Sequence, residues 1–246
     1  MASERVDNVL YLYKGSDSKT TLIYRIIFFA FCLKTVVRDI FYYIRQNRLG
    51  VMFALLTEIS LLLTLLTLSV GILYALKVKS HRPGSRLQRI YGALFTICIS
   101  VETLVFIAYW TLMSWWHFPN YIAKCPSQLV CHYFNLMVHG FPTFVMWFMA
   151  LVEPTEVRKR HGYYLMAYTF IYAACHIPYA MIYGPVYQHL DFNSITGYLG
   201  VCVGYSILYF SFKIYKMVAR NQKTSSCSLE YSTPSKQAQT EKISNF

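Results

Sequence analysis

Charged residues are scarce in this sequence, and acidic ones are the scarcest. Of its 246 residues only 14% are charged, with 11 Asp and Glu against 23 Lys and Arg. The hydrophobic share, 56%, is too high for an ordinary soluble domain. The net charge of +12 does not indicate nucleic-acid binding, because the Lys and Arg fall between long apolar runs and in the C-terminal tail. The composition is that of a multispan membrane domain.

Metal-binding and disulfide patterns are also missing. The seven cysteines include no CxxC pair with the spacing of a metal site. We therefore expect no metal, no cofactor and no disulfide framework, and leave open only a bridge between Cys125 and Cys131. The N-terminus lacks a short apolar core that ends in a small-residue cleavage site, so we expect the first apolar run to stay as an uncleaved anchor.

Six apolar runs predict six transmembrane helices, at about residues 22–44, 51–76, 90–113, 129–153, 163–183 and 194–217. A crossing needs about 20 apolar residues. The first run is the least regular, since Lys34 and Arg38 must extend toward one membrane surface. The sequence thus predicts an all-α polytopic protein with one helical bundle over residues 21–218. Residues 1–20 are a short N-terminal tail, and the polar residues 219–246 are predicted to be a disordered tail.

The distribution of basic residues predicts the topology. Six crossings put both termini on one side, and 17 of the 23 Lys and Arg then lie on that side. Basic residues are retained on the cytoplasmic side, so both termini are predicted to be cytoplasmic. We expect a multi-pass protein of the endoplasmic reticulum or the plasma membrane.

The run at residues 129–153 carries polar residues on one predicted helix face. His132, Asn135, His139 and Thr143 recur every three or four residues, which aligns them along a helix. An ionisable side chain at membrane depth is expensive and indicates a functional site. Pro142 cannot bond the carbonyl one turn earlier, so the helix is predicted to bend beside His139. The run therefore predicts a polar pocket within the membrane.

The run at residues 51–76 has a second polar stripe, formed by Thr57, Ser60, Thr64 and Thr67. Hydroxyls in membrane helices usually bond their own backbone or a neighbouring helix, so most of this stripe is expected to be structural. A carboxyl group within an apolar run is costlier than a hydroxyl, so the structural role expected of the stripe does not by itself account for Glu58 in the same run or Glu102 in the third run. We expect both carboxyl groups to be buried beside polar partners.

The two stripes together suggest a reaction. In the predicted topology Thr57 and His139 differ in depth by roughly 6 Å. A threonine hydroxyl becomes a nucleophile when a base takes its proton, and histidine has a pKa suited to that task. His139 would take the proton, Thr57 would attack an ester carbonyl, and the imidazolium would protonate the leaving alcohol. The residue that orients the imidazole stays open between Glu58, Glu102 and Asn135.

The fifth run contains one further histidine. His176, close to Pro178, either lines the same pocket, as Thr143 is expected to do, or bonds a neighbouring helix.

Three segments resemble a known family. They are similar to segments of the family of androgen-induced and androgen-dependent TFPI-regulating proteins. The three segments are LLTEISLLL around Thr57, MVHGFPTF around His139 and the later GPVYQHLD. The resemblance covers about residues 51–191. It implies a six-span membrane protein that acts as an atypical threonine hydrolase on fatty acid esters of hydroxy fatty acids. It also implies that Thr57 and His139 are the two catalytic residues.

Two functions follow from the sequence. The first is an intramembrane hydrolase that cleaves a lipid ester reaching the pocket sideways from the bilayer. The alternative is a non-enzymatic lipid-binding or transport protein, in which His139 and the threonine stripe only bind a polar headgroup. In both, the partners are the membrane and a lipid, and no nucleic acid is expected.

Overall fold

A computed structural model of the chain describes residues 19–77, 85–113, 128–153, 155, 157–184 and 195–231. Within these residues every regular element is a helix, so the predicted all-α class is confirmed. The helices are α2 (Lys19–Arg45), α3 (Leu49–Ala54), α4 (Leu56–Lys77), α5 (Arg86–Ala108), the π-helix η2 (Tyr109–Met113), α7 (Gln128–His139), α8 (Phe141–Val152), α9 (Lys159–Tyr183) and α10 (Ile195–Tyr231).

These helices have the length and composition of membrane spans. Among the described residues, five helices are long and apolar enough to cross a bilayer, and the bent pair α7 and α8 raises the number to six. Large apolar side chains such as Phe170, Met181 and Ile195 point outward and are more than 70% exposed. Such a surface suits lipid rather than water. The protein is therefore a multi-pass membrane protein.

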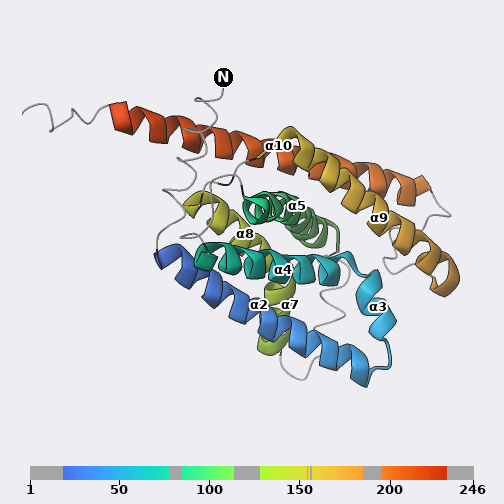
Figure 1. Cartoon of the computed structure of the whole chain (residues 1–246). Coiled ribbons are helices and arrows are strands. Elements are labelled where there is room, and N and C mark those ends of the chain that lie inside the picture. The colour runs from blue at the N-terminus through green and yellow to red at the C-terminus, as the bar shows by residue number, and fades with distance from the viewer. Residues whose placement is uncertain are drawn as a thin grey trace, which may run out of the picture.

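Helix α5 lies at the centre of the bundle (Figure 1). It packs against α4 on one side, α10 on another, and also contacts α8 and α9. Helix α2 packs against the far side of α4. The central place of α5 explains why most of its residues between Tyr91 and Val105 are buried, whereas α9 and α10 each keep a broad exposed face.

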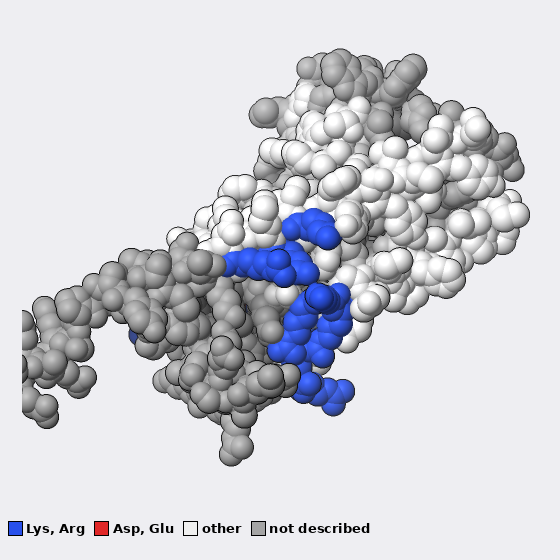
Figure 2. All heavy atoms as spheres, turned by 90° about the horizontal axis from the view of Figure 1, so that it is seen from above, with Lys and Arg blue, Asp and Glu red and all other residues white. Residues whose placement is uncertain are grey.

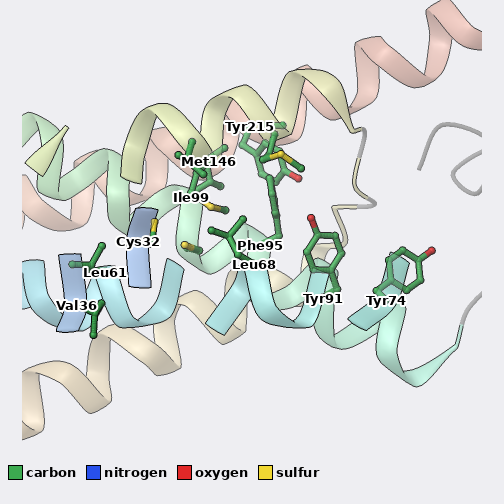
Figure 3. Close-up of a cluster of buried hydrophobic side chains, with 14 residues drawn as sticks. Cys32, Val36, Leu61, Leu68, Tyr74, Tyr91, Phe95, Ile99, Met146 and Tyr215 are labelled. Carbon is green, nitrogen blue, oxygen red and sulfur yellow. The ribbon is translucent and has the colours of Figure 1, made fainter. Parts of the chain in front are cut away.

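The main core cluster joins five of these helices. Figure 3 shows side chains from α2 (Cys32, Val36), α4 (Leu61, Leu68), α5 (Phe95, Ile99), α8 (Met146) and α10 (Tyr215) meeting in one buried layer. Close packing of this kind, together with interhelical hydrogen bonds, holds membrane helices together, because lipid is as apolar as the side chains themselves. The layer fixes the positions of α4, α5 and α8, and so of the elements next to them in the chain, η2 and α7.

The second apolar run is broken near its start. We predicted one continuous helix over residues 51–76, and this was wrong: α3 ends at Ala54 and α4 begins at Leu56. Leu55 between them is extended, with φ −81° and ψ 121°. Hydrophobic periodicity does not detect a break of one residue that keeps the run apolar. The break places Thr57 in the first turn of α4.

The fourth run is bent, as predicted from Pro142. The axes of α7 and α8 meet at 44°, with Gly140 between the two helices. Pro142 is in the first turn of α8, where a helix needs no N–H donor. His139 is consequently the last residue of α7.

The last helix ends later than predicted. Helix α10 continues to Tyr231, past residue 219, where we placed the start of the disordered tail. Its final turns extend away from the bundle (Figure 1). The residues after Ala219 include Arg, Gln and Lys, which have high helix propensity and allow a helix to continue without packing.

Candidate active site at three helix irregularities

The first turn of α4 carries two buried polar side chains. Thr57 is 8% exposed and Glu58 is 6% exposed. The Tyr43 hydroxyl of α2 donates to Glu58 Oε1 at 3.4 Å. The start of α4 is therefore covered by α2.

Thr57 differs from the rest of its stripe. All four side chains of the stripe are buried. The Ser60 hydroxyl donates to the Thr57 carbonyl at 2.8 Å, and the Thr67 hydroxyl donates to the Leu63 carbonyl at 2.8 Å. The Thr64 hydroxyl donates to Glu102 Oε1 at 2.6 Å. Three of the four hydroxyls have the structural bonds expected of them, whereas the Thr57 hydroxyl has no hydrogen bond to any described residue.

The imidazole of His139 is oriented by an aromatic ring. The rings of His139 and Tyr109 stack with centroids 3.6 Å apart and an interplanar angle of 6°. Tyr109 is the first residue of η2, and π-helical turns are frequent at functional sites. His139 Nδ1 is buried and has no hydrogen bond to the described residues. Of the three orienting residues considered above, none bonds the imidazole in the described part of the chain.

The register of α4 and α5 brings Thr57 to the level of Tyr109. The two helices are antiparallel, because Tyr74 stacks on Tyr91 at 5.9 Å while Thr64, earlier in α4, bonds Glu102, later in α5. Going two turns further back along α4 reaches Thr57, and going two turns further along α5 reaches Tyr109. Helix α4 also contacts α7. The two predicted catalytic residues thus lie at one end of the bundle, on helices that touch.

Helix α2 extends this end of the bundle toward α7. Arg38 forms an ion pair with Asp39, and its guanidinium lies 3.9 Å from the centroid of the Phe134 ring. Asn135, next to Phe134 and one turn before His139, is 8% exposed. Arg38, which we expected only to reach toward the membrane surface, therefore connects α2 to the helix that carries His139.

Several buried polar atoms at this end have no partner among the described residues. They are Asp39 Oδ2, Glu58 Oε2, Asn135 Nδ2 and His139 Nδ1. A buried polar atom without a hydrogen bond costs roughly 1–3 kcal/mol. Such a group of atoms is expected where water or a ligand completes the structure. We call this group, with Thr57 and Tyr109, the pocket end of the bundle.

Glu102 and Thr143 lie deeper in the bundle. Glu102 is 1% exposed and accepts from Thr64, so it is buried beside a polar partner, as predicted. The Thr143 hydroxyl donates to the Glu102 carbonyl at 2.8 Å. These bonds join α4, α5 and α8. They position α4, which carries Thr57 two turns from Thr64, and α8, which begins just after His139.

His176 is buried on α9, and Nδ1 of its ring is 3.2 Å from the Tyr172 hydroxyl of the same helix. The two rings also stack at 5.3 Å. One partner of the ring is thus one turn away on the same helix. The bridge between Cys125 and Cys131, which the sequence leaves open, falls outside the side chains that the structure describes.

One buried cluster at the other end was not predicted. Arg25 of α2 is fully buried and forms an ion pair with Glu153, which follows α8. Arg25 also donates to the Gly71 carbonyl at 2.7 Å and to the Tyr91 hydroxyl at 3.4 Å. We call these four residues the Arg25 clasp. An isolated Arg in an apolar run was the available signal, but the sequence does not indicate its partners.

Comparison with protein-family models, with curated proteins and with solved structures found no match to this chain. The resemblance described above consequently depends on the three quoted segments alone.

Proposed function

We propose that this protein is an intramembrane lipid ester hydrolase with Thr57 as the nucleophile and His139 as the base. The observation that carries the proposal is the position of Thr57. It is the one residue of the α4 stripe whose hydroxyl has no partner among the described residues, and it lies level with the Tyr109 ring that stacks on His139. A structural threonine would be expected to bond its own helix, as Thr67 does.

The reaction has two halves. In the first, His139 takes the hydroxyl proton while the Thr57 oxygen attacks the acyl carbonyl, and the proton then passes to the departing alcohol oxygen. The fatty acyl group is left as an ester on Thr57. In the second half, His139 takes a proton from water, the resulting hydroxide attacks the acyl-threonine, and the proton returns to the Thr57 oxygen. The products are a fatty acid and a hydroxylated lipid.

The start of α4 supports this chemistry. The first N–H groups of a helix have no partner within it, and Thr57 and Glu58 are the second and third residues of α4. Together with the helix dipole, such groups stabilise negative charge. We propose that the N–H groups of Thr57 and Glu58 stabilise the oxyanion that forms on the substrate carbonyl.

The proposed substrate is a fatty acid ester of a hydroxy fatty acid, and this choice follows the family resemblance. The apolar outer surface of the bundle suits a substrate that enters sideways from the bilayer. We further propose that the protein lies in the endoplasmic reticulum or plasma membrane with both tails in the cytoplasm. Glycosylation of an acceptor site added at residue 246 would contradict this topology.

Labelling with a fluorophosphonate probe tests the proposal. The purified protein should form a covalent adduct on Thr57, identified by mass spectrometry of the peptide. The adduct should be absent in Thr57→Ala and strongly reduced in His139→Ala. Thr67→Ala is the matched control, since it removes a buried hydroxyl from the same stripe, and it should be labelled like the wild type. A wild-type protein that binds the ester without labelling or hydrolysis would favour the lipid-binding alternative.

A further inference from the structure

A groove opens at the opposite end of α5, away from the pocket end. It has a volume of ≈ 430 Å³ and lies between the first turns of α5 and the start of α9. Its lining residues are Arg86, Arg89, Ile90, Ala93, Leu94 and Ile97 of α5 and Arg160 and Tyr164 of α9.

The groove is strongly basic. Arg86, Arg89 and Arg160 line it, and none of the lining residues is acidic. Figure 2 shows Lys and Arg gathered on this face of the molecule, with no Asp or Glu visible among the described residues. Lys216 of α10 lies close enough to Lys159, at the start of α9, for their charges to interact, and adds to the positive potential. An anion is the expected occupant.

Arg160 indicates a built site rather than a general surface charge. Its Nε is buried and has no hydrogen-bond partner among the described residues. The positive-inside rule explains why cations gather at this end of the helices. It does not explain why three guanidinium groups, from two helices far apart in sequence, line one hollow. Guanidinium groups are the side chains best suited to binding a phosphate through paired hydrogen bonds.

The rest of the groove is apolar. Its apolar residues form one stripe along α5 below the arginines, because they follow Ile90 at three, four and seven residues: Ala93, Leu94 and Ile97. Helix α9 begins beside this stripe, because His161 Nδ1 is 3.2 Å from the Thr96 hydroxyl. The groove thus has cations at its mouth and an apolar wall along its length.

We propose that this groove binds one anionic phospholipid. Its phosphate would contact Arg86, Arg89 and Arg160, and an acyl chain would lie along the apolar stripe of α5. Both α5 and α9 start here, so their positive helix ends add to the attraction. A free phosphate would use only the basic half of the groove, whereas a phospholipid uses both halves. In the predicted topology this end faces the cytoplasmic leaflet, where anionic lipids are found.

Binding of short-chain lipids to the full-length protein in neutral detergent, followed by native mass spectrometry, tests the proposal. Dioctanoyl phosphatidic acid should bind more tightly than dioctanoylglycerol, which lacks the phosphate, and than glycerol 3-phosphate, which lacks the chains. Equal binding of glycerol 3-phosphate would overturn the assignment to a lipid. Absence of phosphatidic acid binding would overturn the site itself.

Charge-matched variants locate the site. The triple variant Arg86→Gln, Arg89→Gln and Arg160→Gln should weaken phosphatidic acid binding by about tenfold or more. The triple variant Lys213→Gln, Lys216→Gln and Arg220→Gln removes the same charge from α10, outside the groove, and should change binding less than about threefold. Equal losses in both would mean diffuse attraction and would overturn the proposal.

A variant that keeps every charge completes the test. Ala93→Trp fills the apolar half of the groove and should weaken phosphatidic acid binding while leaving the basic residues in place. Unchanged binding in this variant, with helical content and thermal stability like the wild type, would overturn the assignment of the acyl chain to the α5 stripe.

Discussion

The two ends of α4 use buried polar groups in opposite ways. Around Gly71, the Arg25 guanidinium donates to a carbonyl, a tyrosine hydroxyl and a carboxylate that come from three other segments. Around Thr57, buried oxygen and nitrogen atoms of Glu58, Asn135 and His139 have no partner among the described residues. At the Arg25 end the charged groups bond one another, and of the guanidinium only Nε lacks a partner among the described residues, whereas the Thr57 end has unpaired polar atoms on several residues.

The backbone also differs between the clasp and the pocket end. The clasp is assembled largely from the interiors of continuous helices, whereas the pocket end combines the α3–α4 break, the α7–α8 bend and the π-helical end of α5. Within a membrane, irregular backbone is tolerated only where protein buries it or where it lines a wet cavity. The clasp is therefore the expected centre of stability, and the pocket end is where the proposed chemistry would take place.

Loss of catalysis is the largest effect that this comparison predicts. Thr57→Ala and His139→Ala should each reduce ester hydrolysis by roughly ten-thousandfold, and the double variant should be scarcely worse, because the two residues act as one unit. The measurement is release of fatty acid from an ester of hydroxystearic acid by the purified protein. Thr57→Ala with wild-type turnover, beside a well-folded His139→Ala, would contradict the proposed function.

Breaking the clasp should affect stability and not turnover. Arg25→Met leaves the Glu153 carboxylate buried without its ion-pair partner and should cost about 3–5 kcal/mol. The double variant Arg25→Met and Glu153→Met should recover most of that loss, since it removes both charges. Thermal unfolding in detergent measures the change. A lower kcat in the protein that remains folded would mean that the two ends are not separate in function.

Removing the aromatic stack should lower turnover and leave stability nearly unchanged. Tyr109→Leu takes away the ring that orients His139. The kcat should fall roughly tenfold to a hundredfold, because a base held in the wrong geometry transfers the proton poorly. Thermal stability should change little, since Tyr109 is only partly buried. Tyr109→Phe keeps the ring and should retain most of the activity. Equal activity of the Leu and Phe variants would exclude an orienting role for the stack.

The smallest effect is expected between the two ends, at Glu102. Glu102→Leu removes the acceptor of the Thr64 hydroxyl and should cost roughly 1–3 kcal/mol. Glu102→Gln keeps an acceptor oxygen and should be tolerated better. Expression and thermal stability of the two variants, measured side by side, give the comparison. Equal stability would show that the Thr64 bond contributes nothing to the bundle.

The fold was largely predictable from the sequence because long apolar runs have few alternatives to membrane helices. The spacing of the α4 stripe predicted that its four polar residues share one helix face, and all four are buried; Pro142 correctly predicted the bend beside His139. Each of these features is determined by residues within one or two turns of the same helix.

The interhelical contacts were not predictable in the same way. The break at Leu55 leaves no trace in hydrophobicity, since the run stays apolar on both sides. The stack of Tyr109 on His139 and the pairing of Arg25 with Glu153 join residues on different helices, and no spacing rule connects them. The orienting residue was sought among carboxyl and amide groups, whereas the structure places an aromatic ring beside the imidazole.

The bend at Gly140 has a consequence for how this protein tolerates mutation. A Cβ atom added there would lie 2.8 Å from Leu136 Cδ1 and 3.1 Å from the Leu136 carbonyl oxygen, so alanine requires the leucine side chain to turn away and the last turn of α7, which ends at His139, to give slightly. In a library of all single substitutions selected for activity, position 140 should tolerate alanine better than any larger residue, and depletion should increase with side-chain size. The position would thus be sensitive through the placement of His139, although a glycine has no side chain with which to take part in the reaction.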